Sequence, residues 1–352
     1  MPSATEIARD LVERRVATSV AAGCVVRRGE EFRMEQGGAT EAYFDLASLT
    51  KPMTAVAVVR SRIAPSWTLS SLLPDLASTP SAEASVELLL SHRAGLAAHL
   101  PLFAPLLAGA PIDAREALRH AAEARREDCG GNMPLAGFPP LYSDLGYLIV
   151  GAALARHTSA LDAGEAIEEH VVAALEARRE LGTARALVSA GVDFEGRAVP
   201  TEDVAWRGGV VRGRVHDENA WALTGAGGSG HAGMFGTLSG VLAFTRAVLE
   251  ALVGRGPFAP TDIGWLTRAR VGGTLRAGFD GKSAHGSSAG ASFGPDSIGH
   301  LGFTGTSLWI DSASGVGVVL LTNRVYPTRE NTAIRAARPA AHEALFRRAL
   351  EL

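Results

Sequence analysis

The sequence predicts an α/β (α+β) protein in which both ends of the chain build one sheet domain around a mostly helical middle. Near the N-terminus, residues 19–26 and 31–35 read as two strands joined by a turn at Gly29. Near the C-terminus, three strand-like segments are separated by Gly and Ser turns. The last of them, 315–322, is a continuous apolar run typical of a central strand. The middle of the chain is rich in Ala and Leu and poor in β-branched alternation, which favours helices.

The remaining elements follow from periodicity and from breaker residues. Ile7, Leu11 and Val16 give residues 5–16 one apolar helical face, and Pro52 places a helix start just after Ser48. We predict further helices at 85–91, 114–127, 143–155, 163–179, 238–253 and 331–351, a Gly-rich loop at 229–237, and strands at 297–303 and 306–311. The sheet domain is therefore assigned to residues 1–64 and 226–352, the helical domain to residues 65–225, and the active site to the cleft between them.

Composition excludes several classes of partner. The chain has 352 residues, 47% of them hydrophobic, and a net charge of −3, and no basic run is interleaved with aromatics, so we expect no nucleic-acid partner. No apolar run reaches the roughly 18 residues of a membrane span, and the polar N-terminus does not resemble a leader. We expect a cytoplasmic protein as the sequence stands, or a periplasmic one if a leader has been removed. Cys24 and Cys129 are expected to be reduced core thiols, although a disulfide between them is left open.

The first chemical signal is Ser48-Leu49-Thr50-Lys51, which contains one of only two lysines in the chain. Positions i and i+3 share a helix face, so the Ser48 hydroxyl can meet the Lys51 amine. A lysine held against the apolar residues 53–59 can lose its proton near neutral pH and activate the serine for attack on a carbonyl. The alternative is that Ser48 caps the helix and Lys51 is a solvated charge.

Two more segments supply candidate partners. Tyr142-Ser143-Asp144 stands at a helix entrance, and a nearby lysine would lower the pKa of the Tyr142 phenol, so that it can act as base or acid. The alternative is a capping Ser or Asp beside a half-buried tyrosine. In residues 300–307 the small residues allow a strand edge to approach a substrate closely, and a backbone N–H there can join the Ser48 N–H in stabilising an oxyanion. The alternative is an ordinary glycine-rich turn.

Together these segments resemble the penicillin-recognising serine hydrolases: class C β-lactamases, D-alanyl-D-alanine carboxypeptidases and β-lactamase-like esterases. Ser48-x-x-Lys51 matches the family's first motif, and Tyr142-Ser143-Asp144 resembles its Tyr-x-Asn motif. Residues 300–305 resemble Lys-Thr-Gly-Ser-Thr-Gly, and residues 88–96 resemble the stretch LLSHTSGL. A further similarity is the segment His231-Ala232-Gly233-Met234-Phe235, which precedes a helix as it does in members of the family. Taken together, the resemblance spans about residues 18–325.

The resemblance implies a β-lactamase/transpeptidase-like fold, with a central antiparallel sheet flanked by helices beside the helical domain. It implies that Ser48, Lys51 and Tyr142 are catalytic and that Phe303 supplies the second oxyanion N–H. Its substrate-binding positions fall on Asp144, His300, Gly302 and Thr304.

Two departures from the family pattern bear on the substrate. Asp144 stands where Asn is usual, cannot donate as a carboxylate, and is expected to hold Lys51 charged or oriented. His300 stands where Lys is usual and is a weaker, pH-dependent cation. Both changes favour an ester or a small amide over a lactam or a peptide ending in D-Ala.

Other polar clusters have simpler explanations. His216-Asp217-Glu218-Asn219 lacks the spacing of a metal site and is expected to be a loop near the cleft. His231 in the Gly-rich run can contact substrate, and His92 is expected to satisfy local backbone groups.

The sequence therefore predicts a serine hydrolase that acts through an acyl-enzyme on a small-molecule ester, amide or lactam. It needs no metal and no other cofactor. The alternatives are a β-lactamase or carboxypeptidase acting on cell-wall substrates, or a binding module in which the serine acylates without turnover or does not react. The sequence predicts no particular oligomeric state.

Overall fold

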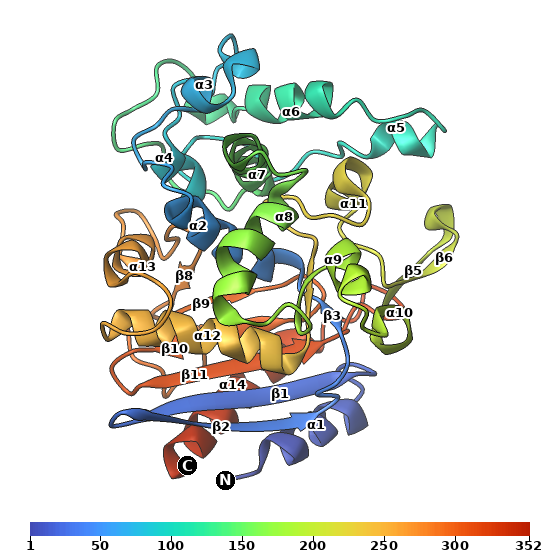
Figure 1. The fold of residues 1–352 in the computed structure, drawn as a ribbon, viewed down its shortest axis with the longest axis vertical. Helices are drawn as coiled ribbons and strands as arrows, with labels where there is room; N and C mark the ends of the chain where they lie inside the picture. Colours follow the sequence, from blue (N-terminus) through green and yellow to red (C-terminus); the bar gives the residue numbers. More distant parts are fainter.

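The computed structural model describes residues 1–352, and its main sheet joins both ends of the chain (Figure 1). Six antiparallel strands lie in the order β2-β1-β11-β10-β9-β8. The predicted hairpin and the three predicted C-terminal strands are all present in it. The strands are β1 (Val20–Arg28), β2 (Glu31–Gly38), β8 (Asp280–Gly281), β9 (Ile298–Leu301), β10 (Ser307–Asp311) and β11 (Val316–Thr322).

The central strands are buried on both faces because helices cover each side of the sheet. Successive side chains of a strand point to opposite faces. Val319 and Leu321 of β11 therefore join the core beneath α12, whereas Val318 and Leu320 join the core beneath α1 and α14. These helices are α1 (Ala4–Glu13), α12 (Leu238–Leu252) and α14 (Ile334–Glu351), and α13 (Pro260–Thr267) packs beside α12. This double cover explains why β11 reads as a continuous apolar run.

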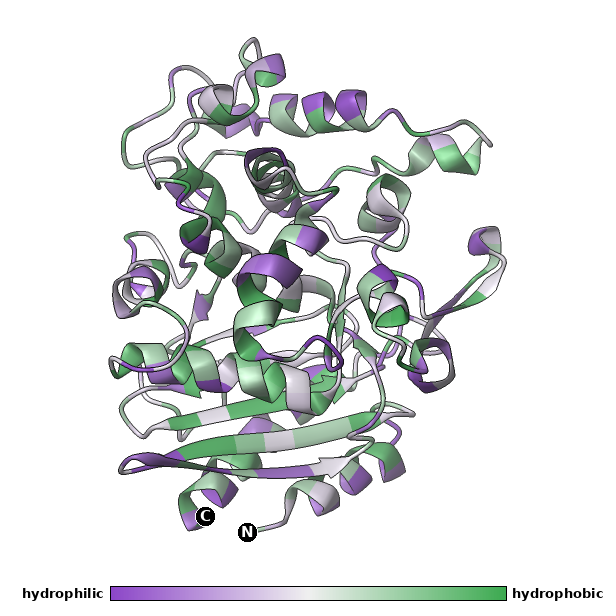
Figure 2. Ribbon diagram, viewed as in Figure 1, coloured by the Kyte–Doolittle hydropathy of each residue, from purple (hydrophilic) through white to green (hydrophobic).

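Strand β2 forms one edge of the sheet and is mostly exposed. Figure 2 shows it as hydrophilic along much of its length, whereas the neighbouring β1 is largely hydrophobic. Charged side chains on an edge strand oppose pairing with another chain.

Helices dominate the middle of the chain, but short strands interrupt them. The segment predicted as one helix, 163–179, is α8 followed by a π-helical turn at Glu168–Val172 and a 3₁₀ turn at Ala173–Leu175. The helices are α2 (Thr50–Arg60), α3 (Leu69–Leu72), α4 (Val86–Leu90), α5 (Ala104–Leu107), α6 (Ala114–Glu123), α7 (Asp144–Thr158), α8 (Ala163–Ile167), α9 (Ala184–Ser189), α10 (Phe194–Arg197) and α11 (Glu218–Thr224). The strands are β3 (Phe44–Asp45), β4 (Leu181–Thr183), β5 (Pro200–Val204), β6 (Gly209–Arg212) and β7 (Met234–Gly236).

A small sheet in the order β3-β7-β4 pairs strands from three distant parts of the chain. β3 leads directly into Ser48, β4 comes from the helical middle, and β7 follows the Gly-rich loop. Three distant segments are thereby brought to the start of α2.

The Gly-rich loop lies against α7 with no room for side chains. A Cβ on Gly151 of α7 would lie 2.4 Å from the Gly230 nitrogen, and one on Gly230 would lie 2.0 Å from the Tyr147 carbonyl oxygen. The glycines therefore allow two backbones to touch, which brings the following residue, His231, close to Lys51.

Cys24 and Cys129 are free, buried thiols, as expected. None of the helices combines the length and apolarity needed to cross a bilayer.

Gly151→Ala is expected to destabilise the protein by about 1–3 kcal/mol, because the added methyl group overpacks the contact between α7 and the loop. The matched control is Gly264→Ala in α13, where nothing lies within 4 Å of the added Cβ. That change is expected to stabilise by about 0.5–1 kcal/mol through helix propensity. Denaturant unfolding of both variants checks this, and equal effects would contradict the packing argument.

Candidate active site

The predicted pair of Ser48 and Lys51 meets at the start of α2. Ser48 lies in a 3₁₀ turn at Ala47–Leu49, and Lys51 and Pro52 lie in the first turn of α2. The Lys51 Nζ donates a hydrogen bond to the Ser48 Oγ at 2.9 Å. The Lys51 side chain is 0% exposed, so it is not the solvated charge of the alternative interpretation.

The backbone before Ser48 is held in an uncommon conformation. Ala47 has a φ of +46°, a left-handed value that L-residues rarely adopt. The Asp45 carboxylate fixes it, because Oδ1 accepts from the Ala47 N–H at 2.8 Å and Oδ2 from the His216 N–H at 2.7 Å. Ser48 lines the adjoining cavity. Strain of this kind, of order 1–3 kcal/mol, is typical of functional turns.

Asp144 gives Lys51 a counter-ion. The Lys51 Nζ donates to the Asp144 Oδ1 at 2.6 Å, and Asp144 is the first residue of α7. Burial alone would lower the pKa of Lys51, but the charge of Asp144, with a contribution from Tyr142, outweighs burial and raises it. The expectation that Lys51 is deprotonated near neutral pH is therefore wrong. The expectation that Asp144 holds it charged agrees with this pKa.

Tyr142 lies beside the same ammonium group. Its ring centroid is 4.7 Å from the Lys51 Nζ. Burial raises the pKa of the Tyr142 phenol, the Lys51 charge opposes that rise, and Asp144 adds to it. The net pKa shift is upward, so the predicted lowering by lysine is wrong. Burial is the main reason that the lysine charge is not enough, and the Asp144 charge adds to it.

His92 holds this tyrosine in place. Its ring stacks on the Tyr142 ring with centroids 4.8 Å apart, and its Nδ1 accepts from the Ser143 N–H at 3.0 Å. Burial and the Lys51 charge put the pKa of His92 well below its ordinary value, so it is a neutral acceptor. The sequence predicted a backbone partner but did not indicate the contact with Tyr142.

The turn between β9 and β10 is attached to the backbone that precedes Ser48. The Thr304 Oγ1 donates to the Asp45 carbonyl at 2.7 Å, and the Thr306 Oγ1 donates to the Leu46 carbonyl at 3.0 Å. A Cβ on Gly302 would lie 2.0 Å from the Thr306 Oγ1 and 2.6 Å from the Leu46 oxygen, so glycine alone fits there.

The Phe303 N–H has no acceptor within the chain. Its peptide is nevertheless held firmly, because Arg338 Nη2 donates to the Gly302 carbonyl at 3.4 Å and Arg324 Nε donates to the Phe303 carbonyl at 2.9 Å. Phe303 lines the same cavity as Ser48. This N–H is thus available to an oxygen bound there.

His300 also lines the cavity but carries no charge there. Its Nδ1 lies 2.9 Å from the Leu301 carbonyl, which can only accept, so the proton is on Nδ1. Burial and the Lys51 charge lower the pKa of His300 to about 3. The expectation of a pH-dependent cation is therefore wrong in the physiological range, because the buried imidazole is neutral.

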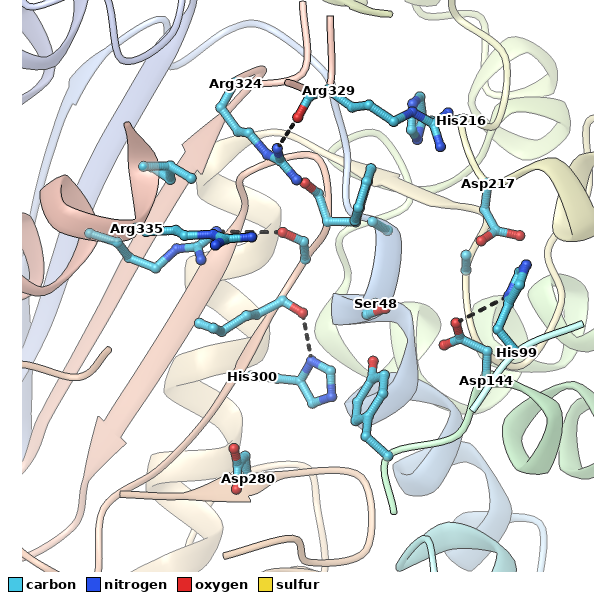
Figure 3. A pocket seen from close by; sticks show the side chains of 18 of the residues that line it. Ser48, His99, Asp144, His216, Asp217, Asp280, His300, Arg324, Arg329 and Arg335 are labelled. Atoms are coloured by element: carbon cyan, nitrogen blue, oxygen red, sulfur yellow. Dashed lines mark hydrogen bonds and ion pairs between the residues drawn. The ribbon is translucent and has the colours of Figure 1, made fainter. Parts of the chain in front are cut away.

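These groups surround a cavity of about 580 Å³. Figure 3 shows Ser48 near its centre, with Arg324, Arg329 and Arg335 on one side and Asp144, Asp217 and His99 on the other. His99 follows no motif in the sequence that would predict its place at the cavity. Its Nδ1 lies 3.8 Å from the Asp144 Oδ2, and the interaction with this carboxylate raises the pKa of His99.

Two predicted substrate contacts do not reach the cavity. Thr304 is 1% exposed and its hydroxyl is used on Asp45. His231 is 1% exposed; its Nδ1 lies 2.7 Å from the Ser229 Oγ and its Nε2 lies 2.9 Å from the Asp217 Oδ1. The His231 carbonyl oxygen lies 3.4 Å from the Lys51 Nζ, which favours a role in holding the lysine.

The loop of His216 to Asn219 lies at the cleft, and its side chains diverge. The His216 Nε2 is 2.9 Å from the Glu202 Oε2, Asp217 contacts His231, and Glu218 is 2.6 Å from Arg329. No group of three or more His, Cys, Asp or Glu side chains is arranged to hold a metal ion.

His300→Asn is expected to weaken the dependence of stability on pH. The folded-state pKa of His300 lies near 3, below the unfolded value of about 6.5, so the unfolded chain binds the extra proton. The stability that neutral His300 contributes is therefore fully present above about pH 6.5. It is lost progressively as the pH falls from 6.5 towards 3. Between pH 7 and pH 5 the wild type should lose about 2 kcal/mol more than the variant.

Denaturant unfolding at several pH values measures this difference. The range from pH 7 to pH 9 is an internal control, because the imidazole stays neutral there. Parallel stability curves for both proteins below pH 6 would contradict the assignment of a neutral His300.

Solved structures share this fold at low sequence identity. EstCE1, described as a hydrolase with promiscuous acyltransferase activity, matches with a TM-score of 0.67 and 18% identity over 97% of this chain and 96% of its own. A class C β-lactamase from Rhodobacter sphaeroides has a TM-score of 0.66 and 17% identity over 98% of both chains. A β-lactamase/D-alanine carboxypeptidase from Pseudomonas syringae has a TM-score of 0.65 and 17% identity over 96% of this chain and 97% of its own.

The family comparison covers nearly the whole sequence. The family model described as Beta-lactamase matches residues 8–342, whereas no curated relative matches the chain. The antiparallel sheet, the flanking helices and the similar structures confirm the predicted β-lactamase/transpeptidase-like fold. The chain belongs to the Beta-lactamase family, whose members are generally serine hydrolases.

Proposed function

We propose that this protein is a serine hydrolase that acts through an acyl-enzyme on an ester or amide of a small molecule, without a cofactor. The observation that carries the proposal is the 2.9 Å hydrogen bond from a fully buried Lys51 ammonium to the hydroxyl of Ser48. A lysine in contact with the hydroxyl of a serine that lines a cavity can take up the serine's proton once the lysine has lost one of its own.

In the proposed reaction, the Ser48 Oγ attacks the substrate carbonyl carbon. The carbonyl oxygen becomes an oxyanion that accepts from the backbone N–H groups of Ser48 and Phe303. The Ser48 proton passes to the Tyr142 and Lys51 pair and then to the leaving alcohol or amine. Water then attacks the acyl-serine ester, and its proton follows the reverse path.

The protonation states of Asp144, Lys51 and Tyr142 before the reaction determine at which pH a base is available to Ser48. Asp144 is a carboxylate, Lys51 an ammonium and Tyr142 a phenol, because the pKa values of Lys51 and Tyr142 are both raised. Either Tyr142 or Lys51 must lose its proton before one of them can accept the Ser48 proton. The rate should therefore increase towards alkaline pH.

The side chains at the cavity favour an ester or a small amide over a lactam. The Asp144 carboxylate has no N–H to donate to a substrate, and its two oxygens already face Lys51 and His99. His300 is neutral and offers no cation to a substrate carboxylate. A β-lactamase or D-alanyl-D-alanine carboxypeptidase activity is the alternative within the same chemistry. EstCE1, a hydrolase with promiscuous acyltransferase activity, shares this fold, which is compatible with the esterase-like proposal.

A second candidate is a protein whose serine acylates without turnover. The raised pKa values of Tyr142 and Lys51 bear on it, since these groups must activate the deacylating water as well as Ser48, and a strongly reactive acylating agent relaxes only the second requirement. Intact mass after incubation with a fluorophosphonate or a penicillin detects the adduct, and steady-state rates show whether it is released. Labelling without turnover would support a sensor, and absence of labelling would support an unreactive binding protein.

Ser48→Ala is expected to abolish hydrolysis of a chromogenic short-chain nitrophenyl ester, lowering the rate by at least about a thousandfold because the nucleophile is lost. Ser239→Ala is the matched control, since Ser239 bonds only to Gln36 on an exposed surface. A Ser48 variant with the full wild-type rate would refute the assignment.

Asp144→Asn is expected to move the ascending limb of the pH–rate profile to lower pH. The Asp144 charge raises the pKa values of both Lys51 and Tyr142, so its removal lowers both. A shift of about one pH unit or more is expected for loss of a charge at this distance. Rates on one ester from pH 6 to pH 10 measure it. A limb that stays in place, or moves to higher pH, would show that Asp144 does not control the base.

A further inference from the structure

Two acceptor groups of the cavity wall lack a partner in the chain. The Asp280 carboxylate of β8 has no counter-ion, and the Nε2 atom of His300 in β9 has no hydrogen-bond donor, although both residues line the cavity that contains Ser48. Asp280 pairs with Gly299, the residue before His300, so the two side chains start from neighbouring positions of adjacent strands. Figure 3 shows His300 between Ser48 and Asp280. We call Asp280 and His300 the acceptor pair.

His300 presents a lone pair to the cavity. Its Nδ1 carries the proton and donates to the Leu301 carbonyl at 2.9 Å, which leaves Nε2 as an acceptor. His300 is 5% exposed, and its Nε2 forms no hydrogen bond within the chain. A buried acceptor without a donor is costly, because it has lost water without a replacement. The Nε2 atom is therefore available to an N–H group of a bound molecule.

Asp280 adds a negative charge to this part of the wall. Its Oδ1 is buried without a hydrogen-bond partner. Burial raises the pKa of Asp280, whereas the nearby Thr274 hydroxyl, the Gly281 N–H and the Arg276 charge work against that rise. The carboxylate is thus only weakly supported by its own surroundings, and a cation placed beside it would stabilise its charged form.

The cations around the acceptor pair are already engaged elsewhere. Arg276 forms no ion pair with Asp280, and its Nη1 donates to the Thr267 carbonyl. Its guanidinium packs against Gly281, where an added Cβ would lie 3.0 Å from both Nε and Nη2. The Lys51 charge also acts on His300, but Asp144 opposes it. The Asp280 charge therefore remains free to act on a molecule in the cavity.

Backbone contacts on both sides hold Asp280 in place. It pairs with Gly299 on one side and forms an isolated bridge with Leu275 on the other. The next residue, Gly281, donates its N–H to the Thr274 carbonyl at 2.9 Å. An acceptor that is fixed before binding saves the cost of ordering it when a ligand arrives.

We propose that Asp280 and His300 bind a protonated amine of the substrate, so that the hydrolysed ester or amide carries an ammonium group. The inference rests on the proposed function and narrows its substrate class. An ammonium group has several N–H donors and no acceptor, so it can donate to the Asp280 carboxylate and to the His300 Nε2 at once. It also supplies the counter-ion that Asp280 lacks. A substrate carboxylate at the same place would meet two acceptors and a like charge.

Matched ester pairs test the preference for a cation. In one arm the nitrophenyl ester of isonipecotic acid is compared with that of cyclohexanecarboxylic acid, which places the ammonium in the acyl half. In the other, para-aminomethylphenyl acetate is compared with para-ethylphenyl acetate, which places it in the leaving group. Each rate is divided by the rate of alkaline hydrolysis without enzyme. The wild type should prefer the cationic member of at least one pair by about tenfold in kcat/KM, and no preference in either arm would overturn the inference.

Asp280→Asn provides the variant, because it removes the charge and keeps the shape of the side chain. The ratio of cationic to neutral kcat/KM should fall by about tenfold, whereas a folding defect would lower both rates and leave their ratio unchanged. Asp203→Asn is the matched control, since Asp203 is exposed in β5 and does not line the cavity. An equal ratio in the wild type and Asp280→Asn would contradict the proposed site.

Binding without hydrolysis separates this inference from the proposed function. In Ser48→Ala, isonipecotamide should raise the melting temperature more than cyclohexanecarboxamide does, because a bound ligand stabilises the folded state. Adding Asp203→Asn should preserve that difference, and adding Asp280→Asn should remove it. If the wild type hydrolyses no ester but this pattern holds, the hydrolase proposal fails and the ammonium site stands. If esters are hydrolysed but the pattern is absent, the ammonium site fails and the hydrolase proposal stands.

Discussion

A single buried ammonium group imposes the strongest constraint on this structure. The Lys51 side chain is fully enclosed, and its Nζ contacts the Ser48 Oγ, the Asp144 Oδ1 and the His231 carbonyl. Leaving such a charge unpaired costs several kcal/mol, so all three partners must be held in place. α2, α7 and the Gly-rich loop therefore have to pack within hydrogen-bonding distance of one point. Gly151 and Gly230 make that packing possible because neither backbone tolerates a Cβ where they meet.

A buried carboxylate, that of Asp45, organises the turn that precedes Ser48. Asp45 fixes the left-handed Ala47 through one oxygen and the His216 loop through the other, while its carbonyl accepts from Thr304. One residue thus links the turn of Ser48, the loop of His216 to Asn219, and the turn between β9 and β10 that contains Phe303. Burial raises the pKa of Asp45, and the bonds it accepts work against that rise. Its role is structural in every contact that it makes.

Charge is distributed unevenly around the cavity. The acidic groups at one end have nearby cations or imidazoles: Asp144 has Lys51, Asp217 has His231, and Glu218 has Arg329. Arg324, Arg335 and Arg338, which also line the cavity, form no ion pair with an acidic side chain. Between them, Lys51 and Tyr142 hold their protons beside Ser48, because the pKa values of both groups are raised. The Asp144 charge contributes to both rises.

The sequence by itself determined five of the six strands of the main sheet, all except β8, together with the start of α2 and the pairing of Ser48 with Lys51. Each of these depends on local periodicity or on an i, i+3 spacing. It also predicted that Asp144 would hold Lys51 charged, since a carboxylate can only accept from an ammonium. Only the tertiary structure decided the protonation of Tyr142 and His300, the burial of Thr304 and His231, and the presence of His99 and the arginines in the cavity. These properties depend on burial and on groups distant in sequence, including Asp45 and α14, which leave no local pattern to read. The pKa of a side chain follows from the sum of its surroundings, and the fold alone brings those surroundings together.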